Sequence, residues 1–378
     1  MPNPEKDAVL LLEDGTSFVG KGFGADGTVE GEVVFNTGMV GYPESLTDPS
    51  YFGQILVATW PLVGNYGVAG RGIVDQFGVP LHFESSRIQV TGYAISELEA
   101  FPSHWTSRAS LSDWLAEDGI PGISGIDSRE LTKKLRVQGT MLGLLSVGTD
   151  VDSQALRKRA KSIRDPNSLD LVSRVTVPEP RDYSPQGGPM VVIVDCGMKL
   201  GILRNLLARG LSVRVVPYDT SADDIIGAKP AGVVISNGPG DPKLCTPTVK
   251  SVRALLETDV PIFGICLGTQ VLALGAGGET FKLKFGHRAQ NHPCGDLKTG
   301  RVYITTQNHG YTVDPKSLDA FEVSFVNLND KTIEGIRHKK KNVMGVQFHP
   351  EASPGPYETG FLFDEFAKVA RGFQSARA

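Results

Sequence analysis

The stretch VPIFGICLGTQVLALGAGG, residues 260–278, joins two patterns within a few residues. It opens on a short apolar run, which is typical of a strand buried on both faces, and it continues into a segment that favours a helix. Cys266 lies at the junction, between Gly264 and Gly268. Glycines on both sides of a reactive side chain are typical of a sharp strand-to-helix turn, because neighbouring Cβ atoms would clash there. The pattern therefore predicts an α/β unit that presents a cysteine on such a turn.

A turn of this kind suits a nucleophile. It lifts the sulfur clear of the backbone and places it near a helix N-terminus, which favours the thiolate. The alternative is a buried structural cysteine, the usual state of a lone cysteine. The paired glycines favour the nucleophile for Cys266. Cys196, in VDCGMK, also follows an apolar run but lacks paired glycines, so we expect it to be buried and structural.

The C-terminal half alternates strand-like and helix-like segments around this stretch. The strand-like runs are followed by helix-like ones at 200–210 and 248–259, and this order predicts βαβ units and a doubly wound, mainly parallel sheet. Consecutive strand-like segments at 300–307, 321–329 and 343–350 then precede a last helix at 360–371. Ligand sites in such sheets lie beyond the carboxyl ends of the strands, which is where Cys266, the loop SNGPGDP at 236–242 and His349 fall.

Length and composition predict two domains. A chain of 378 residues is long for one domain, and PEPRDYSPQGGP at 178–189 holds six Pro or Gly residues, as a linker would. Upstream segments are rich in glycine and β-branched residues, with two helices expected at 110–119 and 127–139. We expect a β-rich α+β N-terminal domain at 1–155, a connecting segment and linker at 156–189, and an α/β domain at 190–378.

The composition excludes several classes of protein. A formal net charge of −4 gives no reason to expect nucleic acid or an anionic membrane as a partner. The chain lacks the roughly 18 continuous apolar residues of a membrane span, and MPNPEKDAVLLLEDG does not resemble a signal peptide. Four cysteines are too few for a disulfide framework in a chain of this size. We expect a soluble, cytoplasmic protein.

GTSFVGKG, residues 15–22, nearly matches a phosphate-binding loop. Gly22 stands where a Ser or Thr would bind magnesium, and no helix is expected to follow. The acidic turn EDG between two strand-like runs predicts a hairpin instead. We therefore expect no nucleotide site in this chain.

A base for the cysteine is expected in QFHPEASPGP, residues 347–356. His349 and Glu351 are two residues apart, so in an extended chain their side chains point the same way and the carboxylate can orient the imidazole. His309, in QNHGY, is the competing base, but it has no carboxylate close in sequence. The sequence favours His349.

Two further motifs are weaker. The backbone N–H groups of SNGPGDP can stabilise an oxyanion or line a pocket, although a plain Gly-Pro turn is the alternative. His287, His292 and Cys294, in GHRAQNHPC, could be taken for metal ligands. Their spacing matches no zinc pattern, and we expect no metal.

Taken together, SNGPGDP, GICLGTQ, QNHGY and QFHPEASPGP resemble the glutamine amidotransferase domain with a Cys-His-Glu triad. The N-terminal segments EVVFNTGMVGYPESLTDPSY, PLVGNYG, SHWTSRASLSDWL and GIDSRELTKKLRVQGTMLG resemble the small, glutamine-hydrolysing subunit of carbamoyl-phosphate synthetase. The likeness runs from about residue 8 to 370, and it extends to the corresponding domain of the fused animal pyrimidine-pathway enzyme.

This resemblance implies a role for each matching residue. Cys266 would attack the side-chain amide carbon of glutamine, His349 would act as base and then as acid, and Glu351 would orient His349. The positions that match the oxyanion-binding and glutamine-binding residues of the family are Leu267, Gly238, Gly240, Gln270, Asn308, Gly310 and Tyr311, with Ser50 reaching across from the N-terminal domain. Thr269 stands where relatives often carry His or Asn, and Tyr311 where they often carry Phe; neither departure removes a required group.

The resemblance also implies a partner. Ammonia would pass to a large synthetase subunit that binds ATP, magnesium and bicarbonate, so no cofactor is expected in this chain. The two subunits would form a heterodimer, with a higher oligomer of heterodimers as a further assembly. Two other interpretations remain open from the residues: a stand-alone cysteine hydrolase such as a γ-glutamyl peptidase, and a scaffolding subunit whose triad is idle. The sequence also leaves open whether the product feeds arginine or pyrimidine synthesis.

Overall fold

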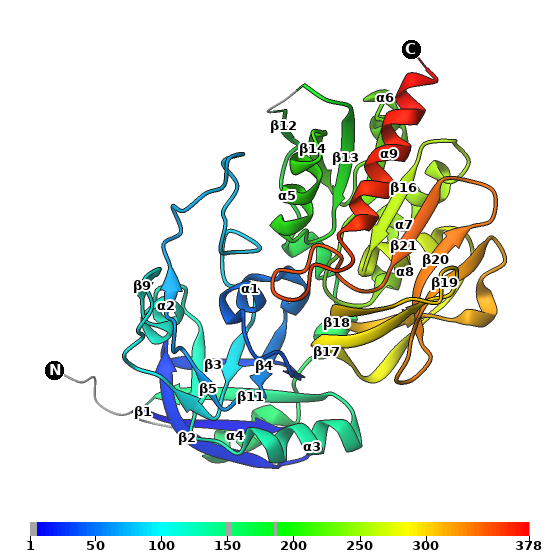
Figure 1. Ribbon diagram of the computed structural model, residues 1–378. Helices are drawn as coiled ribbons and strands as arrows, with labels where there is room; N and C mark the ends of the chain where they lie inside the picture. The colour runs from blue at the N-terminus through cyan, green and yellow to red at the C-terminus, as the bar shows by residue number, and fades with distance from the viewer. Residues whose placement is uncertain (1–5, 149–152, 185–186, 378) are drawn as a thin grey trace. The chain divides into compact units, whose positions relative to one another are not determined.

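The computed structural model describes residues 6–148, 153–184 and 187–377, which form two compact units at 1–169 and 170–378 (Figure 1). The division falls inside the predicted connecting segment at 156–189. Residues 1–5 of the N-terminal stretch and residues 185–186 of the predicted linker lie outside the described residues. The mixture of helices and strands confirms the predicted α/β class. Within the described ranges, every helix is too short or too polar to cross a lipid bilayer.

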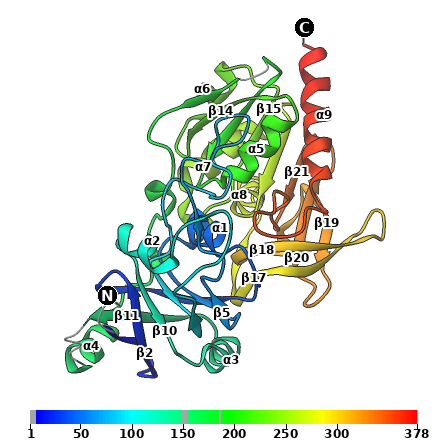
Figure 2. The ribbon, with the colours of Figure 1, turned by 60° about the vertical axis from the view of Figure 1, so that its left-hand side comes forward.

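A closed barrel forms the first unit, in the strand order β1-β11-β3-β4-β7-β10-β2; three of its strands, β2, β10 and β11, are labelled in Figure 2. Its strands are β1 (Lys6–Leu12), β2 (Ser17–Gly24), β3 (Gly27–Asn36), β4 (Gln54–Ala58), β7 (Gly92–Ala94), β10 (Pro121–Ser124) and β11 (Met141–Gly148). β1 and β2 pair as an antiparallel hairpin, with Leu11 opposite Ser17. The predicted hairpin at 15–22 is therefore confirmed, and the near-match to a phosphate-binding loop is strand.

Helices and two small ladders complete this unit. They are α1 (Tyr42–Thr47), α2 (Leu111–Glu117), α3 (Ser128–Gln138) and α4 (Ser153–Ala160), with β5 (Leu62–Val63) beside β8 (Glu97–Leu98) and β6 (Val68–Ala69) beside β9 (Ser107–Ala109). The two helices predicted at 110–119 and 127–139 are confirmed as α2 and α3. The side chain of Ser110 accepts a hydrogen bond from the N–H of Asp113, and that of Asp127 accepts one from Glu130, which satisfies N–H groups that a helix start leaves unpaired.

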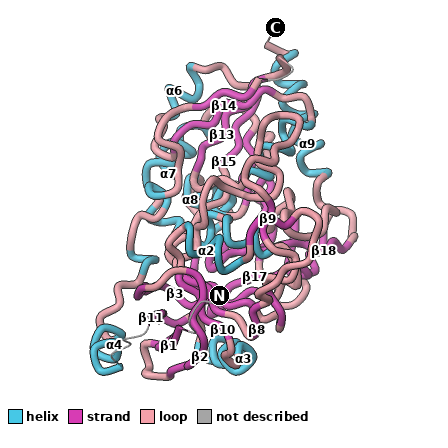
Figure 3. The backbone as a smooth tube through the Cα atoms, turned by 90° about the vertical axis from the view of Figure 1, so that its left-hand side faces the viewer, coloured by secondary structure: helices cyan, strands magenta, loops and turns pink. Residues whose placement is uncertain are grey.

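A ten-stranded sheet forms the second unit, in the order β12-β14-β13-β15-β16-β21-β20-β19-β17-β18. Its strands are β12 (Arg181–Tyr183), β13 (Met190–Asp195), β14 (Ser212–Pro217), β15 (Gly232–Ile235), β16 (Ile262–Ile265), β17 (Thr280–Asp296), β18 (Val302–Val313), β19 (Phe321–Asn327), β20 (Ile333–His338) and β21 (Val343–Val346). Pairing is parallel from β14 to β21 and antiparallel elsewhere. Figure 3 shows three of the parallel strands, β13, β14 and β15, as neighbours.

Helices cover both faces of the parallel strands. α5 (Leu200–Ala208) and α9 (Phe361–Ser375) lie on one face, and α6 (Ala222–Gly227), α7 (Thr246–Leu255) and α8 (Leu267–Gly275) on the other (Figure 1). Neighbouring residues of β16 point to opposite faces. Phe263 packs against Phe363 and Phe366 of α9, with ring centroids 5.7 Å apart in each pair, whereas Gly264 faces Leu272 of α8. This covering explains why the parallel strands are continuous apolar runs.

The antiparallel pair of β17 and β18 is longer than the sequence predicts. β18 runs six residues past the expected end at residue 307, and β17 extends over GHRAQNHPC, where no strand is expected. The pairing register shifts between Lys282 and His287 and again between Ala289 and His292. Such bulges break the period-two alternation of apolar and polar residues, so the usual signal of a strand is absent from this segment.

Candidate active site

Cys266 lies on the strand-to-helix turn that the sequence predicts. It follows β16, precedes α8 and has φ 53° and ψ −107°, a strained backbone conformation for a residue with a Cβ. The flanking glycines make the turn feasible. A Cβ on Gly268 would lie 2.1 Å from the carbonyl oxygen of Ile235, and one on Gly264 would lie 2.7 Å from that of Gly268. The close approach of β15, β16 and α8 therefore requires the GICLG pattern.

β21, the parallel neighbour of β16, brings the predicted base to the cysteine. Ile265 pairs with Val346, and the N–H of Cys266 donates to the carbonyl of Val346 over 2.8 Å, so the residues that follow the two strands lie side by side. His349 Nδ1 donates to Glu351 Oε1 at 2.6 Å. Thiol, imidazole and carboxylate are each at most 2 % exposed. The structure thus brings Cys266, His349 and Glu351 together.

The electrostatic balance of this group keeps a proton on the imidazole. Burial and then the nearby Lys199 would lower the pKa of His349, but the Glu351 carboxylate and then the Cys266 side chain raise it, so that the pKa lies well above the ordinary value for histidine. Nε2 of His349, the nitrogen that faces away from Glu351, has no hydrogen-bond partner among the described residues. An imidazolium held in this way can act as an acid toward a leaving group.

Lys199 is a member of this group that sequence reasoning missed. Its Nζ lies 3.1 Å from Glu351 Oε1 and donates to the carbonyl of Ala352 over 2.5 Å. Burial would raise the pKa of Glu351, but Lys199 and then His349 lower it to about 2, so the carboxylate stays ionised. The only signal in the sequence is a lysine four residues after a buried strand, in MVVIVDCGMK.

Replacing Lys199 by methionine is expected to lower the free energy of unfolding by about 3 kcal/mol, because it removes one of the two cations, Lys199 and the His349 imidazolium, that pair with the buried Glu351 carboxylate. Urea unfolding followed by circular dichroism measures this. Lys243→Met is the matched control, since Lys243 pairs with Glu279 at 2.8 Å where both side chains are about half exposed; we expect a loss below about 1 kcal/mol there. Equal losses in the two variants would contradict the role given to Lys199.

The predicted oxyanion-binding groups lie around the same turn. Leu267 is the first residue of α8, so its N–H has no partner within the helix. Gly238, in the loop after β15, is in close contact with Leu267, because a Cβ there would lie 2.8 Å from Leu267 Cδ2 and 2.1 Å from the carbonyl of Cys196. Gly240 has a φ of +82° that favours glycine. Gly238 thus lies beside the start of α8, whereas the nearest neighbour of Gly240 is Leu171.

The predicted glutamine-binding residues divide between the units. In the second unit, the carbonyl of Asn308 accepts a hydrogen bond from Cys266 Sγ at 3.6 Å, and that of Tyr311 accepts one from Gln270 Nε2 at 2.7 Å. Gly310 lies between these two on β18. Ser50 belongs to the first unit, on the short 3₁₀ helix Pro49–Tyr51, and its contact with glutamine stays a prediction.

Thr269, one of the two departures from the family pattern, ties the turn to its neighbours. Its hydroxyl donates to the carbonyl of Val346 at 2.7 Å and also lies 3.1 Å from the carbonyl oxygen of Gly264. Cys196 is fully buried, as expected, and its N–H donates to Ser236 Oγ at 2.9 Å.

His309, the competing base, belongs to a different polar cluster. Its Nδ1 contacts the carbonyl of Tyr311 at 2.8 Å and its Nε2 contacts Gln307 Oε1 at 3.2 Å. Burial and then the nearby His287 hold its pKa well below the ordinary value. The structure therefore pairs a carboxylate with His349 and not with His309.

The histidines of GHRAQNHPC lie in this second cluster. His287, His309 and Glu334 have ligand-type atoms within 4.8 Å of one another, a trio different from the one considered in the sequence. His287 contacts Asp330 at 2.8 Å and Glu334 at 3.4 Å. Burial would lower the pKa of His287, but Glu334 and Asp330 raise it. His287 thus lies between the side chains of Asp330 and Glu334, and burial raises the pKa of the Glu334 carboxyl group.

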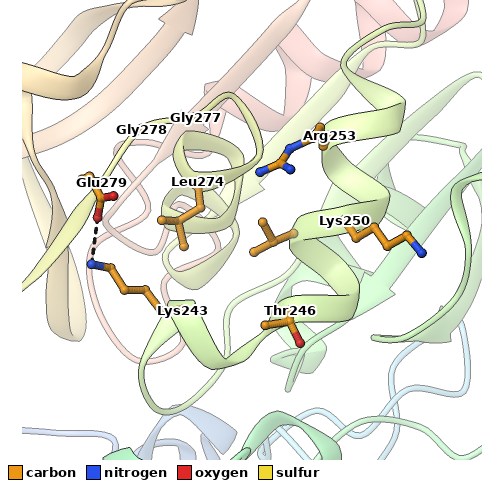
Figure 4. A pocket seen from close by; sticks show the side chains of 9 residues that line it. Lys243, Thr246, Lys250, Arg253, Leu274, Gly277, Gly278 and Glu279 are labelled. Carbon is orange, nitrogen blue, oxygen red and sulfur yellow. Dashed lines mark ion pairs between the residues drawn. The ribbon is translucent and has the colours of Figure 1, made fainter.

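A pocket of about 460 Å³ opens between α7 and α8 (Figure 4). Lys243 and Glu279 form an ion pair at its edge, whereas Lys250 extends away from it. The residues that line it are Lys243, Thr246, Val249, Lys250, Arg253, Leu274, Gly277, Gly278 and Glu279. Since Cys266, His349 and Glu351 are not among them, this pocket is separate from the candidate active site.

Comparison with known proteins agrees with the α/β fold of the second unit. Residues 192–369 match the family "Glutamine amidotransferase class-I", so the second unit is a class-I glutamine amidotransferase domain. Residues 10–145 match "Carbamoyl-phosphate synthase small chain, CPSase domain".

Relatives match over nearly the whole chain. The carbamoyl phosphate synthase small chain of Methanopyrus kandleri is 48 % identical over 370 residues, 96 % of this chain and 99 % of that protein. The arginine-specific small chain of Yarrowia lipolytica is 45 % identical, over 98 % of this chain and 84 % of that protein. The multifunctional protein CAD of Squalus acanthias is 48 % identical over 96 % of this chain and 16 % of its own length. The chain belongs to the family of carbamoyl phosphate synthase small chains, which confirms the predicted identity as its glutamine-hydrolysing subunit.

Proposed function

We propose that the chain releases ammonia from the side-chain amide of glutamine through a γ-glutamyl thioester on Cys266. The thiolate attacks the amide carbon, and the carbonyl oxygen becomes an oxyanion. As the oxyanion collapses, the carbon–nitrogen bond breaks and the His349 imidazolium gives its proton to the nitrogen, which leaves as ammonia. Water then attacks the thioester with His349 as base, which yields glutamate and restores the resting enzyme.

The other site residues have supporting roles in this proposal. The N–H groups of Leu267 and of the loop from Gly238 to Gly240 stabilise the oxyanion. Glu351, held ionised by Lys199, keeps Nδ1 of His349 protonated and directs Nε2 toward the sulfur. The residues proposed to bind glutamine are Gln270, Asn308, Gly310, Tyr311 and Ser50.

The observation that supports the proposal most directly is the buried row formed by Cys266, His349, Glu351 and Lys199 at the turn between β16 and α8. The His349–Glu351 contact of 2.6 Å and the Glu351–Lys199 contact of 3.1 Å involve side chains that are almost fully buried. Burying ionised groups is costly unless each is paired. We infer that these ionised groups are buried together because the reaction needs a proton donor, His349, beside the cysteine.

The ammonia is proposed to pass directly to a large synthetase subunit, because ammonia released into water near pH 7 is mostly protonated and no longer nucleophilic. That subunit would bind bicarbonate, ATP and magnesium, whereas this chain would need no cofactor. The proposed complex is a cytoplasmic heterodimer, alone or within a higher oligomer. We assign much of the docking surface to the first unit, because the candidate catalytic residues all lie in the second.

Adding the large subunit with ATP and bicarbonate is expected to raise the glutaminase rate of this chain by on the order of tenfold or more, because we assign to the partner a stabilisation of the reactive conformation of about 1.4 kcal/mol or more relative to the resting one. The measurement is glutamate release by the purified chain, alone and in the complex. The complex without ATP and bicarbonate is the control.

Two results would contradict the proposal. Rapid turnover of γ-glutamyl peptides by the chain alone would indicate a stand-alone hydrolase. Failure of a glutamine-like alkylating agent to label Cys266 in the complex would indicate a scaffolding subunit with an idle site.

A further inference from the structure

Gln347 is a buried side chain at the reacting sulfur for which the sequence suggests no role. It follows the last residue of β21 and is 1 % exposed. Its N–H donates to the carbonyl of Glu334 over 2.9 Å, which holds the backbone in place. Its side-chain Nε2 donates to Cys266 Sγ over 3.6 Å. The sulfur therefore has the Gln347 amide as a donor on one side and the Asn308 carbonyl as an acceptor, each at 3.6 Å.

The orientation of this amide follows from its neighbours. The carbonyl of Tyr311 can only accept a hydrogen bond, so the group of Gln270 that faces it at 2.7 Å must be the NH₂. The same NH₂ faces one end of the Gln347 amide at 3.1 Å, and that end must be the oxygen. The NH₂ of Gln347 is left facing the sulfur. A backbone carbonyl thus determines, through two amides, that the sulfur meets a donor.

We propose that Gln347 is a sulfur-positioning residue that stabilises the Cys266 thiolate and directs it toward the amide carbon. The inference rests on the proposed function and adds to it a second donor at the nucleophile. Hydrogen bonds to an ionised acceptor are stronger than those to a neutral one, and a neutral thiol is a weak acceptor. The donor therefore favours the thiolate over the thiol.

The same reasoning separates Gln347 from the residues proposed to bind glutamine. Its donor acts on the sulfur before and during attack, and it has no direct contact with substrate in the proposal. Removing it is expected to reduce kcat with little change in KM, whereas removing a group that binds glutamine raises KM. Gln270 keeps its bond to the carbonyl of Tyr311 when Gln347 is changed, so that part of the site is preserved.

The test measures the pH midpoint of Cys266 alkylation by iodoacetamide in the full chain, with the modified cysteine identified by peptide mass spectrometry. Gln347→Met keeps the buried volume and removes the donor. We expect the midpoint to rise by about one pH unit and kcat for glutamine in the complex to fall about tenfold, the effect of one hydrogen bond to a charged group.

Gln307→Met is the matched control. Gln307 is also 1 % exposed, and its Nε2 donates to a different sulfur, Cys294 Sγ, at 3.3 Å. The substitution is the same and the loss of a donor to sulfur is the same, but Cys266 is not involved. We expect the midpoint of Cys266 to stay at the wild-type value.

Gln347→Glu is a second variant that keeps the size and the acceptor for Gln270 but replaces the donor by a carboxylate. The proposal predicts an upward shift larger than that of Gln347→Met, because repulsion between the carboxylate and the thiolate adds to the loss of the donor; Gln347→Met alone therefore measures the donor. A wild-type midpoint and wild-type kcat in Gln347→Met would overturn the inference while leaving the thioester reaction intact. If wild-type protein failed to hydrolyse glutamine, the proposed function would fail, and the alkylation midpoints would still report on Gln347.

Discussion

Replacing Cys266 by alanine is expected to abolish glutamine hydrolysis, with a loss of at least about 10⁴-fold in kcat. The sulfur is the atom that forms the thioester, and no other described cysteine lies on the turn between β16 and α8. Neither the oxyanion-binding N–H groups nor the glutamine-binding residues can replace it. Glutamate release by the complex, measured with ATP and bicarbonate present, tests this.

The same complex should still make carbamoyl phosphate from added ammonium. This second measurement separates a lost nucleophile from a lost fold, because ammonium enters the reaction after the step that needs Cys266. Cys294→Ala provides the matched control: Cys294 is another fully buried cysteine, and we expect glutamine hydrolysis to be retained. Loss of both activities in Cys266→Ala would count against the division of labour between the two subunits.

His349→Asn is expected to lower kcat for glutamine by about 10³-fold or more. Asparagine is close in size and can accept a hydrogen bond, but it cannot carry the proton to the departing nitrogen. The Glu351 contact that raises the pKa of His349 shows why the imidazole is suited to that transfer. Single-turnover measurements of ammonia and glutamate release by the complex would locate the slow step.

His309→Asn is the comparison that tests the choice of base. Its imidazole contacts a backbone carbonyl and an amide, and its pKa lies below the ordinary value, so it is a poor proton donor at neutral pH. We expect a smaller loss of kcat than in His349→Asn. The reverse order would show that the base has been assigned to the wrong histidine.

The His349 substitution also changes how stability depends on pH. Because the pKa of His349 is raised in the folded protein, its imidazolium contributes stability that is fully present below the unfolded value near 6.5. This contribution is lost as the pH rises through the folded pKa. Between those limits the wild type should therefore lose stability with rising pH more steeply than His349→Asn, as measured by urea unfolding across that range.

Several features of this protein were determined by local sequence alone. The glycines around Cys266 predict the turn because any side chain at Gly264 or Gly268 would overlap neighbouring backbone. The hairpin of β1 and β2 and the caps of α2 and α3 also follow from neighbouring residues. Covering of the parallel strands by helices explains the apolar runs that mark β13 and β16. The hairpin and the caps depend on interactions within a few residues, whereas the glycines and the apolar runs record close packing against a neighbour that the pattern does not identify.

Other features were decided only by the tertiary structure. β17 has no strand signal because its bulges interrupt the alternation of side chains. Lys199 meets Glu351 across 152 residues and Gln347 meets Cys266 across 81, so no local pattern marks either contact. Once these groups are buried away from water, each charge and each amide needs a hydrogen-bonding or charged partner within the protein. This burial arises only when β13, β16 and β21 are assembled into one sheet.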